Sequence, residues 1–510
     1  MPISNTTPTK TTFYDSSRLG ITSHAMAIIS KYVSRRDLGV SSSKYCGILV
    51  FKNIHHYSYA SHENTCTIFR SLYSEGNMSS LFSLFLFASN AHAHGIWGHI
   101  HVTGWAIEYT KNPELQEFFS DPVVRNSALF GSAFTDSGYF PFVESIAQHS
   151  NIYSEYTHWE PYVEDYIKWM LQNDPPPFTS LASKKRVAFL MGTASHGLQD
   201  EIFDSLFIHW GEEKDGEGQE TLDPACDGFL AREGELRFYP YEEIPLEPLI
   251  DIYSRLDPDI TEQVIADSVA MMVGLYVNED SGQNTARQLA DLYGENLIWS
   301  EQHYLDPNIP GSIQSEIIPT SRYMEAIWKR LHNEFTSDDI LIATFPEEHR
   351  YLNSTEADSV GSWSTLIFGA GVDAARIDAS LRSWNGKLVS TSLKGTQWGA
   401  EWTRLVRILP EEDLKQNTQY IVNLRTIEAI NGKSKEQIGF LFKTECTNPS
   451  SVQCLTTGTP DVASRTGEKP EETAKKTMGC SHNSQDSDLA WLLIGLGSIL
   501  LWQRKTQQKT

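Results

Sequence analysis

The sequence predicts a multi-domain protein with an all-α domain, a following β-sandwich and a C-terminal hydrophobic tail. Three observations lead to this prediction. Apolar residues recur at the helical period between residues 94 and 335, short strand-like runs alternate with turn residues over 336–446, and an apolar run stands near the C-terminus. A chain of 510 residues has room for two to four domains of about 100–200 residues each.

The overall composition excludes several classes of protein. Hydrophobic residues form 40% of the chain and include 13 Trp, which is enough apolar surface for a folded core and excludes a disordered chain. The net charge of −24 repels phosphate backbones, so we expect no nucleic-acid partner. Six cysteines are too few for a disulfide scaffold. No apolar run reaches the roughly 20 residues of a spanning helix, which excludes a polytopic membrane protein.

The first part of the chain carries an export signal behind a segment of different composition. Residues 1–77 contain more basic than acidic side chains, whereas the remainder is strongly acidic. Either translation starts at Met78 and the natural protein lacks residues 1–77, or these residues are a genuine extension. The segment 78–93 is typical of a signal peptide, because it contains a short apolar stretch and ends in an A-x-A cleavage site. Cleavage there would make His94 the N-terminus, and a buried core helix over 81–93 is the alternative.

The C-terminal part carries a second envelope signal. Residues 447–488 are rich in Thr, Ser, Pro, Glu and Lys and are expected to form a solvated linker. Residues 489–505 are an apolar run with a basic end, which predicts a membrane anchor or a sorting tail like those of Gram-negative surface proteins. Its short length also fits an interfacial or core helix. Cys446 and Cys454 are close in sequence in an exported segment, so we expect a local disulfide.

Helices are predicted in 94–335 from the spacing of apolar residues. In 163–171 and in 260–272 these residues fall at i, i+3, i+4 and i+7, which places them on one helix face. Thr261 stands at an N-cap position, and the prolines at 175–177 separate one helix from the next. An all-α domain therefore accounts for 94–335.

Residues 336–446 change to the pattern of short strands. Asn431-Gly432 is a hairpin signal, and the segment 409–420 resembles a run found in bacterial Ig-like modules, so we expect an Ig-like β-sandwich. We also expect residues 94–335 to fold and to hydrolyse substrate without the β-sandwich. The predicted strands lie at 340–345, 402–409, 420–425 and 438–442.

The first candidate site residues share one predicted helix. Between 187 and 204 the sequence is apolar for two turns and then presents His196, Asp200 and Asp204 at i, i+4 and i+8, on one face. Burying two carboxylates beside an apolar helix costs several kcal/mol unless a positive group compensates, and no Lys or Arg is interleaved. A bound metal ion would provide that charge, and an exposed acidic face is the alternative.

Further residues with metal-ligand chemistry stand elsewhere in the same domain. His99 lies in a helical stretch, Asp136 in an F-x-D-x-x-Y run and His158 in a Thr-His-Trp run. Imidazole and carboxylate are the usual zinc ligands of hydrolytic sites, which also leave a position for water. Taken singly, each of these residues is also compatible with a structural role, and Asp136 with a turn.

The order of these motifs resembles the zinc-dependent phospholipase C family. Gly-His-Ile at 98–100 is followed by F-x-D-x-x-Y at 134–139, Thr-His-Trp at 157–159 and A-F-L-x-G-x-x-S-H-x-x-x-D at 188–200. Within the family, the chain is most similar to the catalytic domain of the glycosylphosphatidylinositol-specific phospholipases D. The resemblance extends over 94–335 and implies an all-α fold around a cluster of three metal ions.

The resemblance also implies a ligand set for each ion. In the family, one ion is bound partly by the amino group and carbonyl of the mature N-terminal residue. Carried over by position, the ligands are His94, His99 and Asp200 for one ion, Asp136, His158, His196 and the bridging Asp200 for another, and Asp204, Asp223 and Asp227 for the third.

The third ligand set departs from the family, which usually has histidine at its first two positions. Three carboxylates make a harder oxygen site that suits calcium, magnesium or manganese better than zinc. We therefore expect two or three zinc ions as cofactors, with the third site open to one of these other metals. An acidic loop over 223–227 is the alternative interpretation.

The implied activity is that of a secreted metal-dependent phospholipase that hydrolyses phosphodiester bonds of phospholipids or glycosylphosphatidylinositol at a membrane surface. Asp136 is the candidate for orienting or deprotonating the attacking water. The expected location is the cell surface or outer membrane of a Gram-negative bacterium, with release from it as an alternative. A nuclease or phosphatase with the same trinuclear site and a non-catalytic surface adhesin are the other functions considered. The sequence leaves open C-type against D-type cleavage, the head group and the oligomeric state.

Overall fold

The computed structural model describes residues 95–444, except for positions 142, 234–241, 277–285, 289, 293, 295, 346–350, 353–363, 396–400, 413 and 416. Within these residues, no helix combines the length and the apolar character needed to cross a bilayer. Several expectations lie outside the described residues, namely those for 1–77, the signal peptide at 78–93, His94, the Cys446–Cys454 disulfide, the linker at 447–488 and the tail at 489–505.

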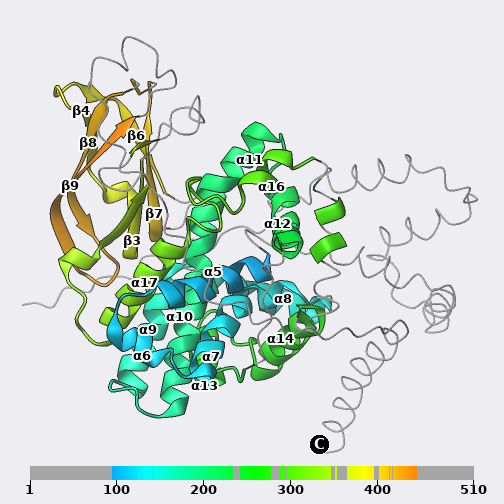
Figure 1. Ribbon diagram of the computed structural model, residues 1–510. Coiled ribbons are helices and arrows are strands. Elements are labelled where there is room, and N and C mark those ends of the chain that lie inside the picture. The colour runs from blue at the N-terminus through cyan, green and yellow to red at the C-terminus, as the bar shows by residue number, and fades with distance from the viewer. Residues whose placement is uncertain are drawn as a thin grey trace, which may run out of the picture. The chain divides into compact units, whose positions relative to one another are not determined.

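The first part of the described chain is helical, as the spacing of its apolar residues predicts (Figure 1). The long helix α10 packs against α5, α7, α9 and α17 and so lies inside the bundle. The helices are α5 (Ile96–Tyr109), α6 (Pro113–Phe118), α7 (Pro122–Phe134), α8 (Glu144–Thr157), α9 (Glu160–Asn173), α10 (Leu181–Ile202), α11 (Ile208–Lys214), α12 (Gln219–Glu233), α13 (Leu246–Tyr253), α14 (Glu262–Tyr276), α16 (Ile298–His303) and α17 (Ile317–Leu331), with short turns of other helix types at η4 (Thr135–Tyr139), η5 (Phe203–Phe207), η6 (Ser337–Asp339) and η7 (Ala374–Arg376).

Local sequence signals set the beginnings of these helices. The side chain of Asp121 accepts a hydrogen bond from the backbone of Val123 before α7, and Ser180 accepts one from Ser183 at the start of α10. The expected cap at Thr261 is present, since its hydroxyl accepts from the Val264 N–H at 3.3 Å. Side-chain caps satisfy backbone donors that would otherwise have no partner in the first helical turn.

The contact between α7 and α10 places two halves of the candidate site side by side. A Cβ atom on Gly192 of α10 would lie 1.9 Å from the carbonyl oxygen of Ala128 in α7, so only glycine permits this approach. The chain continues from α7 directly into η4, which carries Asp136. Close packing of the two helices therefore brings η4 next to His196 on α10.

The second part of the described chain is a β-sandwich, and the four predicted strands and the hairpin at Asn431–Gly432 are present. One sheet has the order β1-β3-β7-β6 and the other β2-β9-β8-β4-β5. Pairing is antiparallel except for β2 with β9. The strands are β1 (Leu341–Phe345), β2 (Tyr351–Leu352), β3 (Ser364–Val372), β4 (Ala379–Ser383), β5 (Leu388–Val389), β6 (Thr391–Lys394), β7 (Thr403–Pro410), β8 (Gln419–Glu428) and β9 (Ser434–Thr444).

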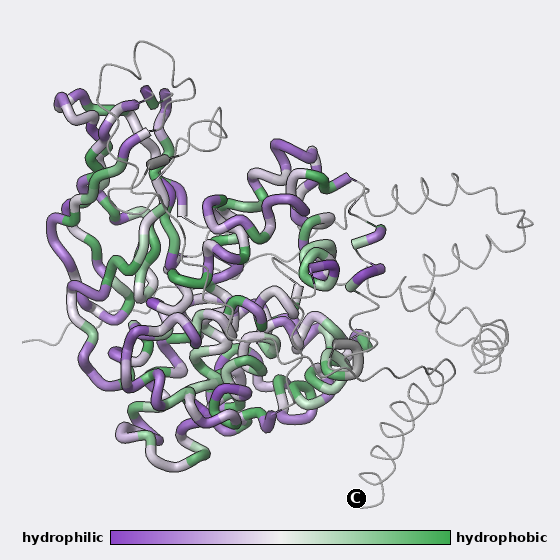
Figure 2. The backbone as a smooth tube through the Cα atoms, viewed as in Figure 1, coloured by the Kyte–Doolittle hydropathy of each residue, from purple (hydrophilic) through white to green (hydrophobic). Residues whose placement is uncertain are grey.

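The sandwich packs directly on the helices through β1, β3 and β7, which contact α10 and α17 (Figure 1). Ile367 and Leu405 belong to the core of the helical bundle, and Ala326 and Phe335 belong to that of the sandwich. Strand β7 is buried along most of its length, whereas buried and more exposed residues alternate along β8, the central strand of the other sheet. Figure 2 shows apolar and polar stretches interleaved along the sandwich. The two regions therefore share one continuous buried interface.

Candidate metal centre

Four elements that are distant in sequence bring five of the predicted ligands together in the helical region. His99 comes from α5, Asp136 from η4 and His158 from the end of α8, while His196 and Asp200 are one turn apart on α10. All five side chains are buried, with exposed fractions between 0% and 6%. The alternative interpretation, an exposed acidic face, is therefore excluded for His196 and Asp200.

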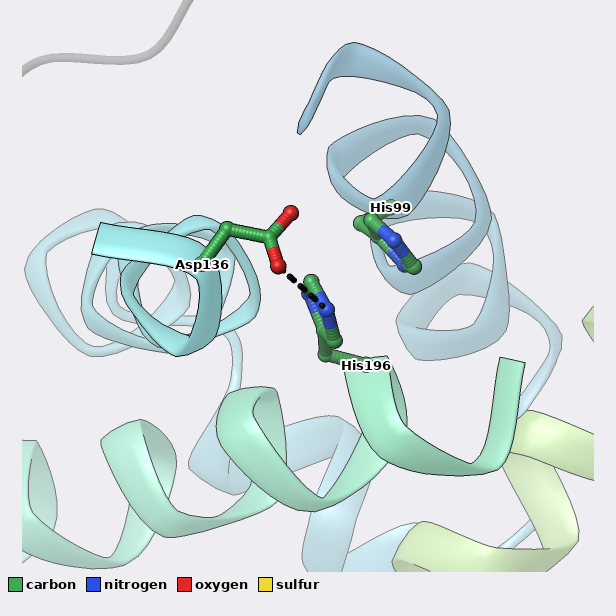
Figure 3. Close-up of side chains that lie close together, drawn as sticks. All are labelled: His99, Asp136 and His196. Carbon is green, nitrogen blue, oxygen red and sulfur yellow. Dashed lines mark ion pairs between the residues drawn. The ribbon is translucent and has the colours of Figure 1, made fainter. Parts of the chain in front are cut away.

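The imidazole and carboxylate groups converge on one point. Asp200 lies between all three histidines, with carboxylate-to-Nε2 distances of 3.2 Å to His99, 3.2 Å to His158 and 3.3 Å to His196. Asp136 Oδ1 is 3.3 Å from His158 Nε2 and 3.5 Å from His196 Nε2. Figure 3 shows Asp136 and His99 on either side of the His196 ring, whose centroid is 3.5 Å from that of His99. Asp200 is thus close to the Nε2 atoms of all three histidines.

The other ring nitrogens are fixed by acceptors of the protein. The Nδ1 of His158 donates to the carbonyl oxygen of Ser154 at 2.7 Å, and that of His196 to the carbonyl of Ser132 at 2.5 Å. The Nδ1 of His99 donates to the side-chain oxygen of Gln199 at 2.9 Å. With Nδ1 donating in each ring, the Nε2 atoms point to the shared centre, where the neutral form of each imidazole offers a lone pair, as in ligating histidines.

The electrostatics of the centre are those of anions and imidazoles held in close proximity. Burial lowers the pKa of His196, but Asp200 and Asp136 outweigh it and raise that pKa to about 10. In turn, burial raises the pKa of Asp136, but His196 and His158 lower it well below its usual value. Burial and repulsion from His196 lower the pKa of His99. Burial raises the pKa of Asp200 as well, but His196 and His99 lower it well below its usual value. Both carboxylates are therefore ionised and are stabilised by nearby positive charge.

These groups fit metal ions. His99, Asp136 and His196 form one set, and His158, His196 and Asp200 form another, with the ligand atoms of each set within 4.8 Å of one another. Among the described residues, both oxygens of Asp200 and Oδ1 of Asp136 are buried without a hydrogen-bond donor. Leaving buried carboxylates in that state is unfavourable, whereas a cation between them and the Nε2 atoms satisfies both.

The structure does not gather the predicted third ligand set in the same way. In the part of the chain that the structure describes, Asp204, Asp223 and Asp227 form no comparable cluster. The π-helical turn η5 carries Asp204, whose oxygens lie 3.4 Å from the amide nitrogen of Gln219. Asp227 accepts a 2.9 Å hydrogen bond from the Gly98 N–H at the start of α5, and burial raises its pKa to about 7. Asp223 is buried on α12.

Sequence reasoning missed two polar residues that belong to the surroundings of the centre. Gln199 directs His99, and its position within the predicted metal-binding helix, directly before Asp200, was a signal that could have identified it. Glu316, fully buried just before α17, had no such signal. Burial raises the pKa of Glu316, and repulsion from Asp200 and Asp204 raises it further.

A second His/Asp cluster lies away from this centre. His149 Nδ1 is 2.7 Å from Asp257 Oδ2, and Asp259 is the third member. Its side chains are partly or fully exposed.

The chain shows limited similarity to known proteins. No family model matches it. It is 30% identical over 119 residues to the phosphatidylinositol-glycan-specific phospholipase D of Bos taurus, covering 23% of this chain and 14% of the relative. The Rattus norvegicus protein of the same name is 27% identical over 135 residues, covering 26% of this chain and 15% of the relative. The similarity is thus distant and partial, and the chain spans about one seventh of the length of these curated relatives.

Solved structures also show local likenesses. CopC from Methylosinus trichosporium OB3b is 21% identical, with 21% of this chain and 95% of that chain covered and a TM-score of 0.18. The surface layer protein SbsC, domains 1–6, is 12% identical, with 64% of this chain and 46% of that chain covered and a TM-score of 0.18. These scores add nothing to the fold that the helices and strands already define.

Proposed function

We propose that the protein is a metal-dependent phosphodiesterase whose substrates are phospholipids or glycosylphosphatidylinositol. The observation that carries this proposal is the buried group of three imidazoles and two carboxylates, with every Nδ1 held by an oxygen acceptor and every Nε2 directed at a carboxylate. The partial similarity to phosphatidylinositol-glycan-specific phospholipases D supports the same reaction class.

The proposed ligands divide into two overlapping sets. Asp136, His158, His196 and Asp200 would hold one zinc ion, and His99, Asp200 and the N-terminal residue His94 would hold the other. Bound zinc ions would withdraw charge from the phosphodiester oxygens and lower the pKa of the attacking water. Asp204, Asp223 and Asp227 remain the proposed ligands of a third ion, which their oxygen chemistry directs towards calcium, magnesium or manganese.

Asp136 would act on water as a hydrogen-bond acceptor. Its pKa lies well below its usual value because His196 and His158 stabilise the carboxylate. A strongly acidic carboxylic acid is a weak base at neutral pH, so Asp136 is better suited to orienting a water molecule than to keeping its proton. Asp200 would fix the orientation of the three histidine rings, since its carboxylate contacts all three.

The substrate and location are part of the proposal. A chain with a net charge of −24 is poorly suited to a polyanionic substrate, which favours a lipid over a nucleic acid. The signal-like segment at 78–93 and the apolar tail at 489–505 support export to the surface of a Gram-negative cell, where phospholipid is available.

The test combines metal analysis with four substrates. Protein beginning at His94 is purified, its metal content is measured by mass spectrometry, and it is assayed on phosphatidylcholine, phosphatidylinositol, a glycosylphosphatidylinositol-anchored protein and single-stranded DNA. We expect two tightly held zinc ions, hydrolysis of a lipid substrate that a chelator abolishes and zinc restores, and no hydrolysis of DNA. Whether the phosphate leaves with the head group or stays on the lipid distinguishes C-type from D-type cleavage.

The same experiment identifies the other functions. Hydrolysis of DNA would assign the centre to a nuclease. Zinc binding without hydrolysis of any substrate would favour a non-catalytic surface protein, and the absence of bound metal would contradict the proposal itself.

A further inference from the structure

A charged residue of the β-sandwich is completely buried inside the helical bundle. Arg404, the second residue of β7, has an exposed fraction of 0%, and its guanidinium group lies among helices α9 and α10 and the end of α8. Its carboxylate partner is Glu201, which is also buried, with Nη2 and Nε of Arg404 at 2.7 Å and 2.8 Å from Glu201 Oε1. A buried ion pair persists only when its geometry and further hydrogen bonds offset the loss of hydration.

The other N–H groups of the Arg404 side chain donate hydrogen bonds to backbone carbonyls in the segments that carry the metal-centre residues. Its Nη2 donates to the carbonyl oxygen of His158 at 2.6 Å, and its Nη1 to that of Ala194 at 3.3 Å. His158 and His196 both face the metal centre. Glu201 directly follows Asp200, which belongs to both proposed ligand sets. One guanidinium group therefore connects the end of α8 with two positions on α10, Ala194 and Glu201.

The backbone of β7 completes the contact with Glu201. The Arg404 N–H donates to Glu201 Oε2 at 2.8 Å, and the Thr403 hydroxyl donates to the same oxygen at 2.9 Å. Both oxygens of this carboxylate are thus satisfied by the sandwich. Since Glu201 is fixed in this way, the turn of α10 that carries Asp200 is fixed with it.

A glycine on α10 makes room for this arrangement. A Cβ atom on Gly197 would lie 2.1 Å from the carbonyl oxygen of His158 and 2.8 Å from Arg404 Nη2. Any side chain at this position would push the His158 carbonyl and the guanidinium away from the helix. Gly197, directly after His196, thus permits the close approach of the His158 carbonyl and the Arg404 guanidinium group to α10.

We propose that Arg404 is a positioning residue of the metal centre, through which the β-sandwich holds His158 and the Asp200 turn of α10 at ligand geometry. The inference rests on the proposed function, because it requires that these residues bind metal. The planar guanidinium reaches Glu201 and two carbonyls at once, which the single ammonium of lysine cannot do. The sandwich is then part of the catalytic unit rather than a separate attachment module.

The test uses the full chain and the variant Arg404→Lys, which keeps the positive charge but removes the planar guanidinium group and its several N–H donors. Zinc affinity is measured by competition with a chromogenic chelator at a temperature where the metal-free variant is folded, and kcat and KM are measured on the lipid substrate. We expect the zinc dissociation constant to rise and kcat to fall by about 10- to 100-fold each, as for loss of an outer partner of a ligand, with KM unchanged. The matched control is Arg425→Lys on β8, whose side chain is 83% exposed and whose ion pair with Asp378 lies on the sandwich surface. It should behave as the wild type.

The outcomes distinguish a failure of this inference from a failure of the proposed function. A wild-type chain that binds no zinc overturns the proposed function and this inference with it. A wild-type chain that binds zinc and a folded Arg404→Lys variant with unchanged zinc affinity and kcat overturn this inference alone. If Arg404→Lys does not fold, Glu201→Gln, which keeps the size of that side chain and leaves Arg404 in place, decides by the same measurements. Failure of both variants to fold would assign the pair a purely structural role and overturn the inference.

Discussion

Two clusters in the helical region contain the same residue types but differ in their surroundings. In the buried cluster, His99, His158 and His196 surround two carboxylates whose inward oxygens lack hydrogen-bond donors among the described residues. In the surface cluster, His149 and Asp257 are each 17% exposed and bond to one another. The other ring nitrogen of His149 contacts the Gln148 amide, and the second Asp257 oxygen accepts a backbone N–H.

The difference separates a metal centre from an ordinary ion pair. At the surface, every polar side-chain atom of the His149–Asp257 pair has a protein partner, so no cation is needed. In the buried cluster, burial removes water from carboxylate oxygens that have no hydrogen-bond donor among the described residues, and a metal ion between them and the Nε2 atoms satisfies both. Proximity of histidine and aspartate is therefore a weaker signal than burial combined with Nε2 atoms directed at carboxylates.

Replacing the central carboxylate gives the largest expected effect. Asp200→Asn keeps the side-chain volume but removes the negative charge that two cations would share. We expect metal content to fall, and activity to decrease by more than the about 10- to 100-fold that loss of an outer partner produces. Mass spectrometry of the bound metal and lipid hydrolysis are the measurements. Asp257→Asn is the matched control in the surface cluster, and an equal loss in both variants would remove the distinction between the clusters.

Removing the support of one imidazole should have an intermediate effect. Gln199→Leu deletes the acceptor of the His99 Nδ1–H, so the ring can rotate away from Asp200. We expect zinc affinity to fall by about 10- to 100-fold, measured by chelator competition. The control is Gln263→Leu, which removes an exposed amide that bonds Asp267 within α14. Wild-type affinity in the Gln199 variant would mean that the ring is held by its packing alone.

Acidity should weaken metal binding at the buried cluster only. The two aspartates raise the pKa of His196 to about 10 in the metal-free protein. Protonation of His196 therefore stabilises the fold fully below its usual pKa of 6.5, and this stabilisation is lost as the pH rises through about 10. Zinc must displace that proton, so its affinity should rise about tenfold per pH unit in this range. Calorimetry in buffers of different ionisation enthalpy measures the proton released, and a pH-independent affinity would contradict the expectation.

The smallest effect is expected at the surface cluster. His149→Ala removes a partly exposed ion pair, so the free energy of unfolding should fall by about 1 kcal/mol or less. Zinc content and lipid hydrolysis should stay at the wild-type level. A loss of bound metal in this variant would show that the exposed cluster also binds an ion and would weaken the role assigned to burial.

Part of the site could be predicted because its signal is local. His196 and Asp200 are one helical turn apart, and an apolar helix that presents both indicates a compensated, buried pair. The third set shows the limit of such reasoning. Asp204 continues the same spacing, but the helix changes to a π turn at Phe203–Phe207, and Asp227 is engaged with the start of α5. Neither the change of helix type nor the contact with α5 follows from periodicity.

The sequence by itself determined the helical and strand regions, their order and the residue types of the centre, because hydrophobic period, caps and turn residues act over a few positions. Only the tertiary structure decided that α5, η4, α8 and α10 converge, and that Ser132, Ser154 and Gln199 orient the imidazoles. It also placed Arg404 of β7 against Glu201, more than two hundred residues away in sequence. Such contacts depend on how whole elements pack, and no local pattern encodes that packing.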